Sequence, residues 1–124
     1  MQTEKSYRIE IEDRGVYLYV LVGGDKLTAD IAATYWREIA DVCFDLKKSK
    51  ILIEKDFAQS VSPLEMVQMG TFLGQLLVNK KIAFLDRYGN EDINELGKKI
   101  ARNRNVIMQT FKDIKDAEKW ITSN

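Results

Sequence analysis

Hydrophobic and polar positions along the chain follow two periods, which predict alternating strands and helices. Strict alternation over residues 7–12 predicts a half-buried edge strand. Residues 16–22 are apolar on both faces, which predicts a central strand paired with the first as a hairpin. Short apolar runs predict three more strands, at residues 51–56, 82–85 and 106–111, with loops at residues 23–27 and 57–61.

Between these strands, apolar residues recur at helical spacing and predict helices. Each predicted helix starts after a residue type that favours the N-cap position. These caps are Thr28, Ser62, Asp92 and Asp113. The predicted element order is therefore ββαβαβαβα.

The second helix has the clearest start. Ser62 caps it, Pro63 suits its first position, and Glu65 closes a capping box with Ser62. Residues 66–78 then contain no charge, whereas a surface helix normally keeps a charged face. We therefore expect this helix to be covered nearly all round, in a βα unit at the centre of the fold.

The predicted fold is α/β, with a mostly parallel five-stranded sheet and an antiparallel edge strand. A chain of 124 residues is expected to form one domain, residues 1–124. If the strands lie in sequential order, right-handed crossovers place the helices on one face. The other face then needs cover from returning chain or from another subunit, and we expect a homodimer.

Composition excludes several classes of function. Lys plus Arg equals Asp plus Glu at 19 each, so nothing global favours nucleic acid. The chain has no histidine, which removes catalytic triads and imidazole metal sites; we expect no enzyme activity and no cofactor. Cys43 has no partner within the chain and lies on an apolar helix face, which predicts a buried, inert thiol. With no secretory signal pattern at residues 1–5, we expect a cytoplasmic protein.

Charged residues follow several strands and allow two interpretations. The carboxylates that follow strands are Asp25, Asp56, Asp86 and Asp113. The first three could hold Mg²⁺, with Lys55 or Arg87 facing a phosphate, or all four could be ordinary loop and cap residues. We favour the second interpretation because no phosphate-binding motif accompanies them. Basic residues at positions 98, 99, 102 and 104 could likewise meet phosphates or anionic lipid, but a solvated helix end explains them better.

The element order, the capped central βα unit and the closing segments at residues 103–106, 111–113 and 117–121 resemble the SpoIIAA-like group of STAS-like proteins. The resemblance spans residues 7–121 and implies a (βα)n superhelix, an architecture shared with CRAL-TRIO lipid-binding domains. Relatives of this kind include anti-sigma-factor antagonists, which bind a regulatory kinase and are switched by serine phosphorylation. The branch that this chain resembles implies ligand binding or membrane association instead.

The resemblance also gives a phosphosite region. The family motif Asp-Ser-Ser-Gly-Leu-Gly matches residues 60–65, where Val61 falls on the phosphoacceptor and both glycines are missing. Ser60 and Ser62 flank that position and are the candidate phosphosites. A regulatory switch that binds a partner protein is therefore the alternative function.

The main prediction is a non-catalytic module that binds an apolar ligand, a membrane surface or a partner subunit. Methionine and aromatic side chains on the second helix suit an adaptable cleft. The predicted ligand-binding residues are Leu64, Met66, Met69, Phe72 and Leu73. Gly70 and Gly74 allow two accounts of this helix: a mobile lid over the cleft, or close packing in a closed core.

Overall fold

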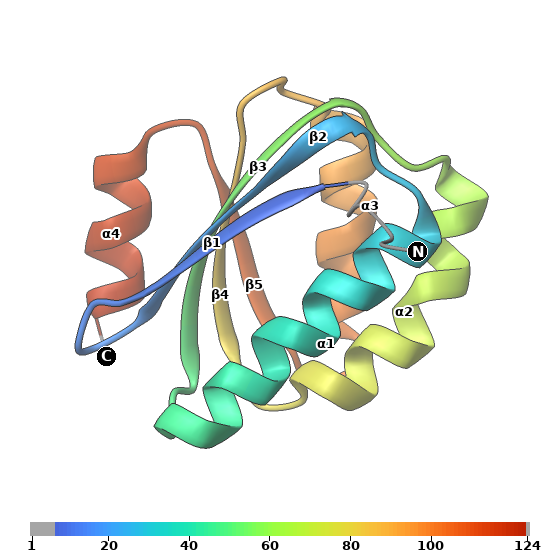
Figure 1. Ribbon diagram of the computed structural model, residues 1–124. Coiled ribbons are helices and arrows are strands. Elements are labelled where there is room, and N and C mark those ends of the chain that lie inside the picture. The colour runs from blue at the N-terminus through green and yellow to red at the C-terminus, as the bar shows by residue number, and fades with distance from the viewer. Residues whose placement is uncertain (1–6, 124) are drawn as a thin grey trace, which may run out of the picture.

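Within residues 7–123, which the computed structural model describes, five strands and four helices alternate along the chain (Figure 1). The strands are β1 (Arg8–Asp13), β2 (Leu18–Lys26), β3 (Lys50–Gln59), β4 (Lys81–Asp86) and β5 (Ile107–Phe111). The helices are α1 (Ala29–Leu46), α2 (Pro63–Leu77), α3 (Glu91–Arg102) and α4 (Ile114–Thr122). The predicted order ββαβαβαβα is confirmed.

The strands form one sheet in sequential order, β1-β2-β3-β4-β5. β1 pairs antiparallel with β2, and Ile9 lies opposite Val22. All other neighbours pair parallel, so the ends of β3 and β4 lie side by side, with Lys55 opposite Asp86. The predicted fold class, a mostly parallel sheet with an antiparallel edge strand, is confirmed.

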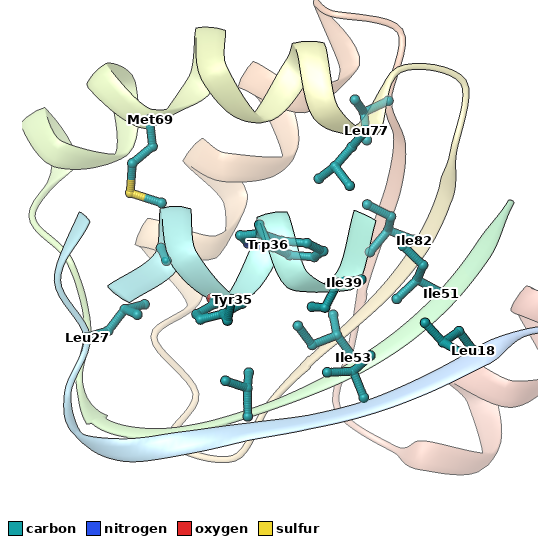
Figure 2. Close-up of a cluster of buried hydrophobic side chains, with 14 of the residues drawn as sticks. Leu18, Leu27, Tyr35, Trp36, Ile39, Ile51, Ile53, Met69, Leu77 and Ile82 are labelled. Carbon is teal, nitrogen blue, oxygen red and sulfur yellow. The ribbon is translucent and has the colours of Figure 1, made fainter. Parts of the chain in front are cut away.

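Helices cover the two faces of the sheet unequally. α1, α2 and α3 lie on one face, and α4 lies on the other (Figure 1). On the first face, Tyr35 and Ile39 of α1 pack onto the strands, and Met69 and Leu77 of α2 point into the same core (Figure 2). This larger core lies beneath α2, the helix that the sequence predicted to be at the centre of the fold.

α4 covers the second face by returning over the strands. Ala117 and Ile121 of α4 are fully buried and pack with Tyr17, Leu52 and the strand residues around them. The sequence allowed this sheet face to be covered either by returning chain or by another subunit. Over this part of the sheet the cover is the returning chain.

Three of the four predicted N-caps are confirmed, and one is wrong. The side chains of Thr28, Ser62 and Asp113 accept hydrogen bonds from the first turns of α1, α2 and α4. Asp92 is not a cap, because α3 begins earlier, after Asn90. Asn90 has left-handed backbone geometry with φ 45° and uses its side chain to donate to Asp86 instead of capping.

Two strands run further than predicted, into segments expected to be loops. Phe57 lies within β3 and is fully buried, since it packs against the apolar core. Gly23 lies within β2, where a Cβ atom would stand 2.6 Å from the carbonyl oxygen of Asp56 and 2.9 Å from an Arg8 nitrogen. Glycine therefore fits this position because a side chain would clash inside the sheet, and not because the chain turns here.

The prediction that α2 is covered nearly all round is wrong. Leu64 is 67% exposed and Val67 is 53% exposed, and Thr71 and Gln75 on the same face are exposed too.

Cys43 is buried as predicted, and burial raises the pKa of its thiol. Among the described residues, no helix combines the length and the apolar character needed to span a membrane.

Candidate functional site

The junction between β3 and α2 is held by hydrogen bonds that use both of its serines. Ser62 Oγ accepts from the Glu65 backbone N–H at 3.2 Å, and a Glu65 carboxylate oxygen accepts from the Ser62 N–H at 3.1 Å. Ser60 Oγ accepts a hydrogen bond of 2.8 Å from Lys55 Nζ. Between them, Val61 is buried in the larger core. The phosphosite region is thus a structured helix start in which the central residue points inward.

Lys55 is a cation buried in the core. Its side chain is 2% exposed, and its Nζ lies 3.4 Å from Oδ2 of Asp86, whose side chain is 3% exposed. Burial lowers the pKa of Lys55, and the attraction of the Asp86 carboxylate opposes that shift. One of the two interpretations of the sequence had Lys55 facing a phosphate, whereas the structure places it in a closed ion pair.

Asp86 collects donors from the start of α3. Its Oδ2 accepts from Asn90 Nδ2 at 3.1 Å and from Asn94 Nδ2 at 3.0 Å, and its Oδ1 accepts from the Tyr88 N–H at 2.9 Å. Four partners therefore converge on one carboxylate at the carboxyl end of β4. This is the edge at which open α/β sheets bind ligands.

An apolar cavity of about 70 Å³ lies beside this cluster, between the sheet and the helices α1, α2 and α3. Lys55 and Asn94 line it, together with apolar residues of the three helices, β4, β5 and the adjoining segments. A more open, polar hollow of about 490 Å³ lies at the ends of β4 and β5 and the start of α3. Phe84 and Asn94 line both spaces, so they form the wall between them.

The predicted ligand-binding residues divide into two groups. Met66, Met69 and Leu73 line the cavity. Leu64 is exposed on the outer face of α2. Phe72 lies under the guanidinium of Arg37 of α1, which stands 4.9 Å from its ring centroid. The structure therefore brings together the inner three residues and leaves the other two on the surface of the helix layer.

Three of the four strand-end carboxylates serve the fold, and Asp25 is exposed near the end of β2. Asp56 accepts from Arg8 and from Arg87, and Asp113 caps α4. With Asp86 paired to Lys55, these groups are engaged by cations or backbone N–H groups. Within residues 7–123, no group of acidic, cysteine or histidine side chains is arranged to hold a metal ion.

A second polar network lies on the sheet face that carries α4. Glu54 accepts from Tyr19 Oη at 2.8 Å and from Arg87 Nε at 3.1 Å. Burial and the hydrogen bond to Glu54 raise the pKa of Tyr19 to about 12. Arg14 stacks over the Tyr19 ring at 3.9 Å from its centroid. These side chains cover the part of this sheet face that lies beyond α4.

Three members of the basic cluster make contacts within the fold. Arg104 donates to Thr71 Oγ1 at 3.1 Å, and Arg102 donates to Gln109 at 3.1 Å. Lys98 lies 3.4 Å from Glu95 in the same helix. The cluster thus contacts α2 and β5, so the expected solvated helix end describes it only in part.

Comparison with known proteins gives the fold its class. No protein-family model matches the chain, and no curated protein matches it. The chain is similar to the crystal structure of an anti-sigma factor antagonist from Mycobacterium paratuberculosis, with TM-score 0.67 and 13% identity over 99% of this chain and 100% of that one. It is also similar to an uncharacterized protein of the DUF3478 family with a SpoIIAA-like fold from Shewanella loihica PV-4, with TM-score 0.55 and 18% identity over 98% of each chain.

The chain therefore has the SpoIIAA-like fold, and the resemblance noted in its sequence is confirmed at the level of fold. Both similar chains are matched over nearly their whole length, so the likeness concerns the complete domain. The relationship to CRAL-TRIO domains stays a prediction.

Proposed function

We propose that this protein is a non-catalytic regulatory module that binds a partner protein through the exposed face of α2. The observation that carries the proposal is an uncharged helix face open to solvent. Its members recur at helical spacing and are exposed. They are Leu64, Val67, Gln68, Thr71, Gln75 and the C-cap residue Val78.

This face is unusual for a helix on the surface of a protein. A surface helix normally turns charged residues to water, and exposed apolar residues grouped on one face mark interaction sites. The SpoIIAA-like fold shared with an anti-sigma factor antagonist favours a partner of the anti-sigma-factor type. The absence of histidine from the sequence supports a role without catalysis.

The test places charge on the face and keeps a matched control. A photo-crosslinking residue at position 67 should trap one stoichiometric partner in the native cell. The variant Leu64→Asp/Val67→Asp should bind the purified partner about tenfold more weakly or worse by calorimetry, because charge enters the apolar contact. The control Val16→Asp changes an apolar residue of similar exposure, 57%, between β1 and β2 and should bind like wild type.

Two results would end this proposal. If the α2 variant binds as tightly as the control, the surface is wrong. If no stoichiometric partner is trapped at position 67, the protein-binding function itself is wrong.

We further propose that phosphorylation of Ser60 or Ser62 is not the switch. Val61 occupies the phosphoacceptor position and has no hydroxyl, Ser62 Oγ caps α2, and Ser60 Oγ is bound by Lys55. Stoichiometric phosphoserine at either position, found by mass spectrometry of protein from its native cell, would overturn this.

A second candidate function is binding of an apolar ligand, and the cavity beside Met66, Met69 and Leu73 favours it. At about 70 Å³ the space is smaller than the cavity of about 150 Å³ known to hold benzene. A small apolar molecule is therefore the appropriate probe, and a fatty acyl chain would require α2 to move. Isopentane should shift the methyl resonances of Met66 and Met69 in saturable fashion; no shift at either methionine would remove this candidate.

The remaining expectations from the sequence are proposals with direct tests. A homodimer would have to use surface such as the α2 face, because α4 already covers much of the second sheet face. Light scattering at micromolar concentration tests it. A cytoplasmic location and binding to a membrane surface are tested by cell fractionation and by flotation with phospholipid vesicles.

A further inference from the structure

The cavity between the sheet and α2 and α3 is apolar except at one end. Met66, Met69 and Leu73 line one part of it, and Lys55 and Asn94 bring a charged and an amide side chain to its wall. Both polar side chains contact the same atom, Asp86 Oδ2, at 3.4 Å and 3.0 Å. The polar groups are therefore gathered at one place on the wall.

Asn94 carries a buried acceptor that the fold does not use. Its Nδ2 donates to Asp86 Oδ2 at 3.0 Å and to the Gly89 carbonyl oxygen at 2.8 Å, and these two acceptors fix the orientation of the amide. Its Oδ1 is buried and has no hydrogen-bond partner among residues 7–123. The residue is only 8% exposed, so water at the surface does not serve that oxygen. A buried carbonyl oxygen without a donor destabilises the protein, so a ligand that brings a donor to this oxygen gains affinity.

Lys55 supplies a donor nearby. Its ammonium has three N–H bonds, one of which donates to Ser60 Oγ at 2.8 Å, while Asp86 Oδ2 lies 3.4 Å away. One N–H bond is left beyond these two partners. A ligand group that accepts a hydrogen bond from Lys55 and donates one to Asn94 would satisfy the remaining hydrogen-bonding groups of both side chains. A hydroxyl group can do both.

We propose that the cavity binds a small uncharged molecule that carries one hydroxyl group and an apolar body. The hydroxyl donates to Asn94 Oδ1 and accepts from Lys55 Nζ, and the apolar body packs against Met66, Met69 and Leu73. This proposal rests on the second candidate function above and names its ligand chemistry.

Charge and size set the limits of this ligand class. Asp86 already balances the charge of Lys55, so a carboxylate ligand would bring a second anion into the same buried cluster. The volume of about 70 Å³ suits a short, compact molecule. Thioether side chains at Met66 and Met69 can adapt to its shape. An acid with a long chain fails on both counts, and a compact alcohol meets both.

The experiment compares isobutanol with isopentane, which have the same branched carbon skeleton except that a methyl group replaces the hydroxyl. Binding is followed by the methyl resonances of Met66 and Met69 in the folded full-length chain. The ratio of the isopentane to the isobutanol dissociation constant should fall about tenfold from wild type to Asn94→Leu, because the hydroxyl loses its acceptor. Asn103→Leu, at the exposed C-cap of α3, is the matched control and should keep the wild-type ratio.

A measurement on the wild-type protein alone tests the proposal even if Asn94→Leu does not fold. The side-chain carbonyl carbon of Asn94 should shift with isobutanol and stay in place with isopentane. If both probes move the methionine methyls while the Asn94 carbon stays fixed with isobutanol, or the ratio is unchanged in Asn94→Leu, hydroxyl recognition is wrong and the apolar-ligand function stands. If neither probe moves the methionines, both are wrong and the cavity holds water only.

Discussion

Gly74 of α2 lies so close to Arg104 that a Cβ atom on Gly74 would stand 2.6 Å from Cδ and 2.8 Å from Cβ of that side chain. A Cβ on Gly70 would likewise collide with Ile100 of α3. Of the two accounts that the sequence allows, these contacts favour close packing of α2 on α3 over a loose lid. Glycine lowers the stability of the isolated helix, but it lets α2 and α3 approach closely and gain van der Waals contacts.

The first prediction concerns these glycines. Gly70→Ala and Gly74→Ala should each lower the free energy of unfolding by about 1–3 kcal/mol, because the methyl group overpacks the helix contact. Gly97→Ala in α3 is the control, since its Cβ would meet only the flexible end of Met66, at 3.3 Å and 3.4 Å. It should raise stability by up to about 1 kcal/mol through helix propensity. Urea unfolding checks all three, and stabilisation at position 70 or 74 would restore the mobile-lid account.

Local signals in the sequence predicted the fold well. The capping box of Ser62 and Glu65 depends on residues three apart, and the alternation in β1 lies within one strand, so each is visible without tertiary structure. Asn90 gave no such signal, because the Asp86 carboxylate that holds its side chain lies outside the helix that it begins.

The candidate site was harder to predict, for physical reasons that particular residues show. The burial of Lys55 depends on Asp86 of the neighbouring strand, and pairing between strands is not local. The available signal was the alternation of β3, which puts Lys55 on the same strand face as Ile53 and Phe57. Leu64 was predicted to line a cleft but lies outside it. Residues 66–78 carry no charge, so the sequence does not show which face of α2 is turned to solvent. Asn94, which lines the cavity, was missed because a single amide in a helix resembles any solvated residue.

The second prediction separates the two sides of the buried ion pair. Asp86→Asn should lower the free energy of unfolding by about 3–5 kcal/mol, because it leaves the Lys55 ammonium buried without a counter-charge. Lys55→Met should cost less, since Asp86 keeps the donors Asn90, Asn94 and the Tyr88 N–H. Chemical unfolding of both variants at neutral pH provides the comparison. Equal losses would mean that the three remaining donors do not stabilise the carboxylate.

The third prediction concerns the alkaline titration of Tyr19. Its pKa is raised to about 12, first by burial and then by the hydrogen bond to Glu54. Because the unfolded phenol ionises near pH ~10, the folded state holds its proton longer, and the resulting stability is complete below that pH. It is then lost as the pH rises through the folded pKa of about 12.

Nuclear magnetic resonance of the phenolic carbon measures this titration directly. Glu54→Gln should lower the pKa of Tyr19 but leave it above the ordinary value, since burial is the larger cause. An unchanged midpoint in Glu54→Gln would show that the Glu54 carboxylate does not act on this phenol. Tyr19→Phe should make stability less sensitive to pH in the same alkaline range.

The fourth prediction concerns the capping box at the start of α2. Ser62→Ala should lower the free energy of unfolding by about 1 kcal/mol, because the Glu65 N–H loses its acceptor at the helix start. Ser49→Ala, at an exposed position before β3, is the control and should change stability little. Glu65→Ala removes the reciprocal bond to the Ser62 N–H, so the double variant should lose less than the sum of the two single losses.

The same variants separate a structural role of Ser62 from a regulatory one. The Ser62 backbone N–H lowers the pKa of Glu65, so the contribution of the Glu65 carboxylate is present above its ordinary pKa and is lost as the pH falls through the lowered value. The stability difference between wild type and Glu65→Gln should therefore shrink in acid. If Ser62 serves as a cap, Ser62→Ala keeps partner affinity near wild type after correction for the folded fraction. Loss of partner binding in a fully folded Ser62→Ala protein would instead place its hydroxyl in the interface.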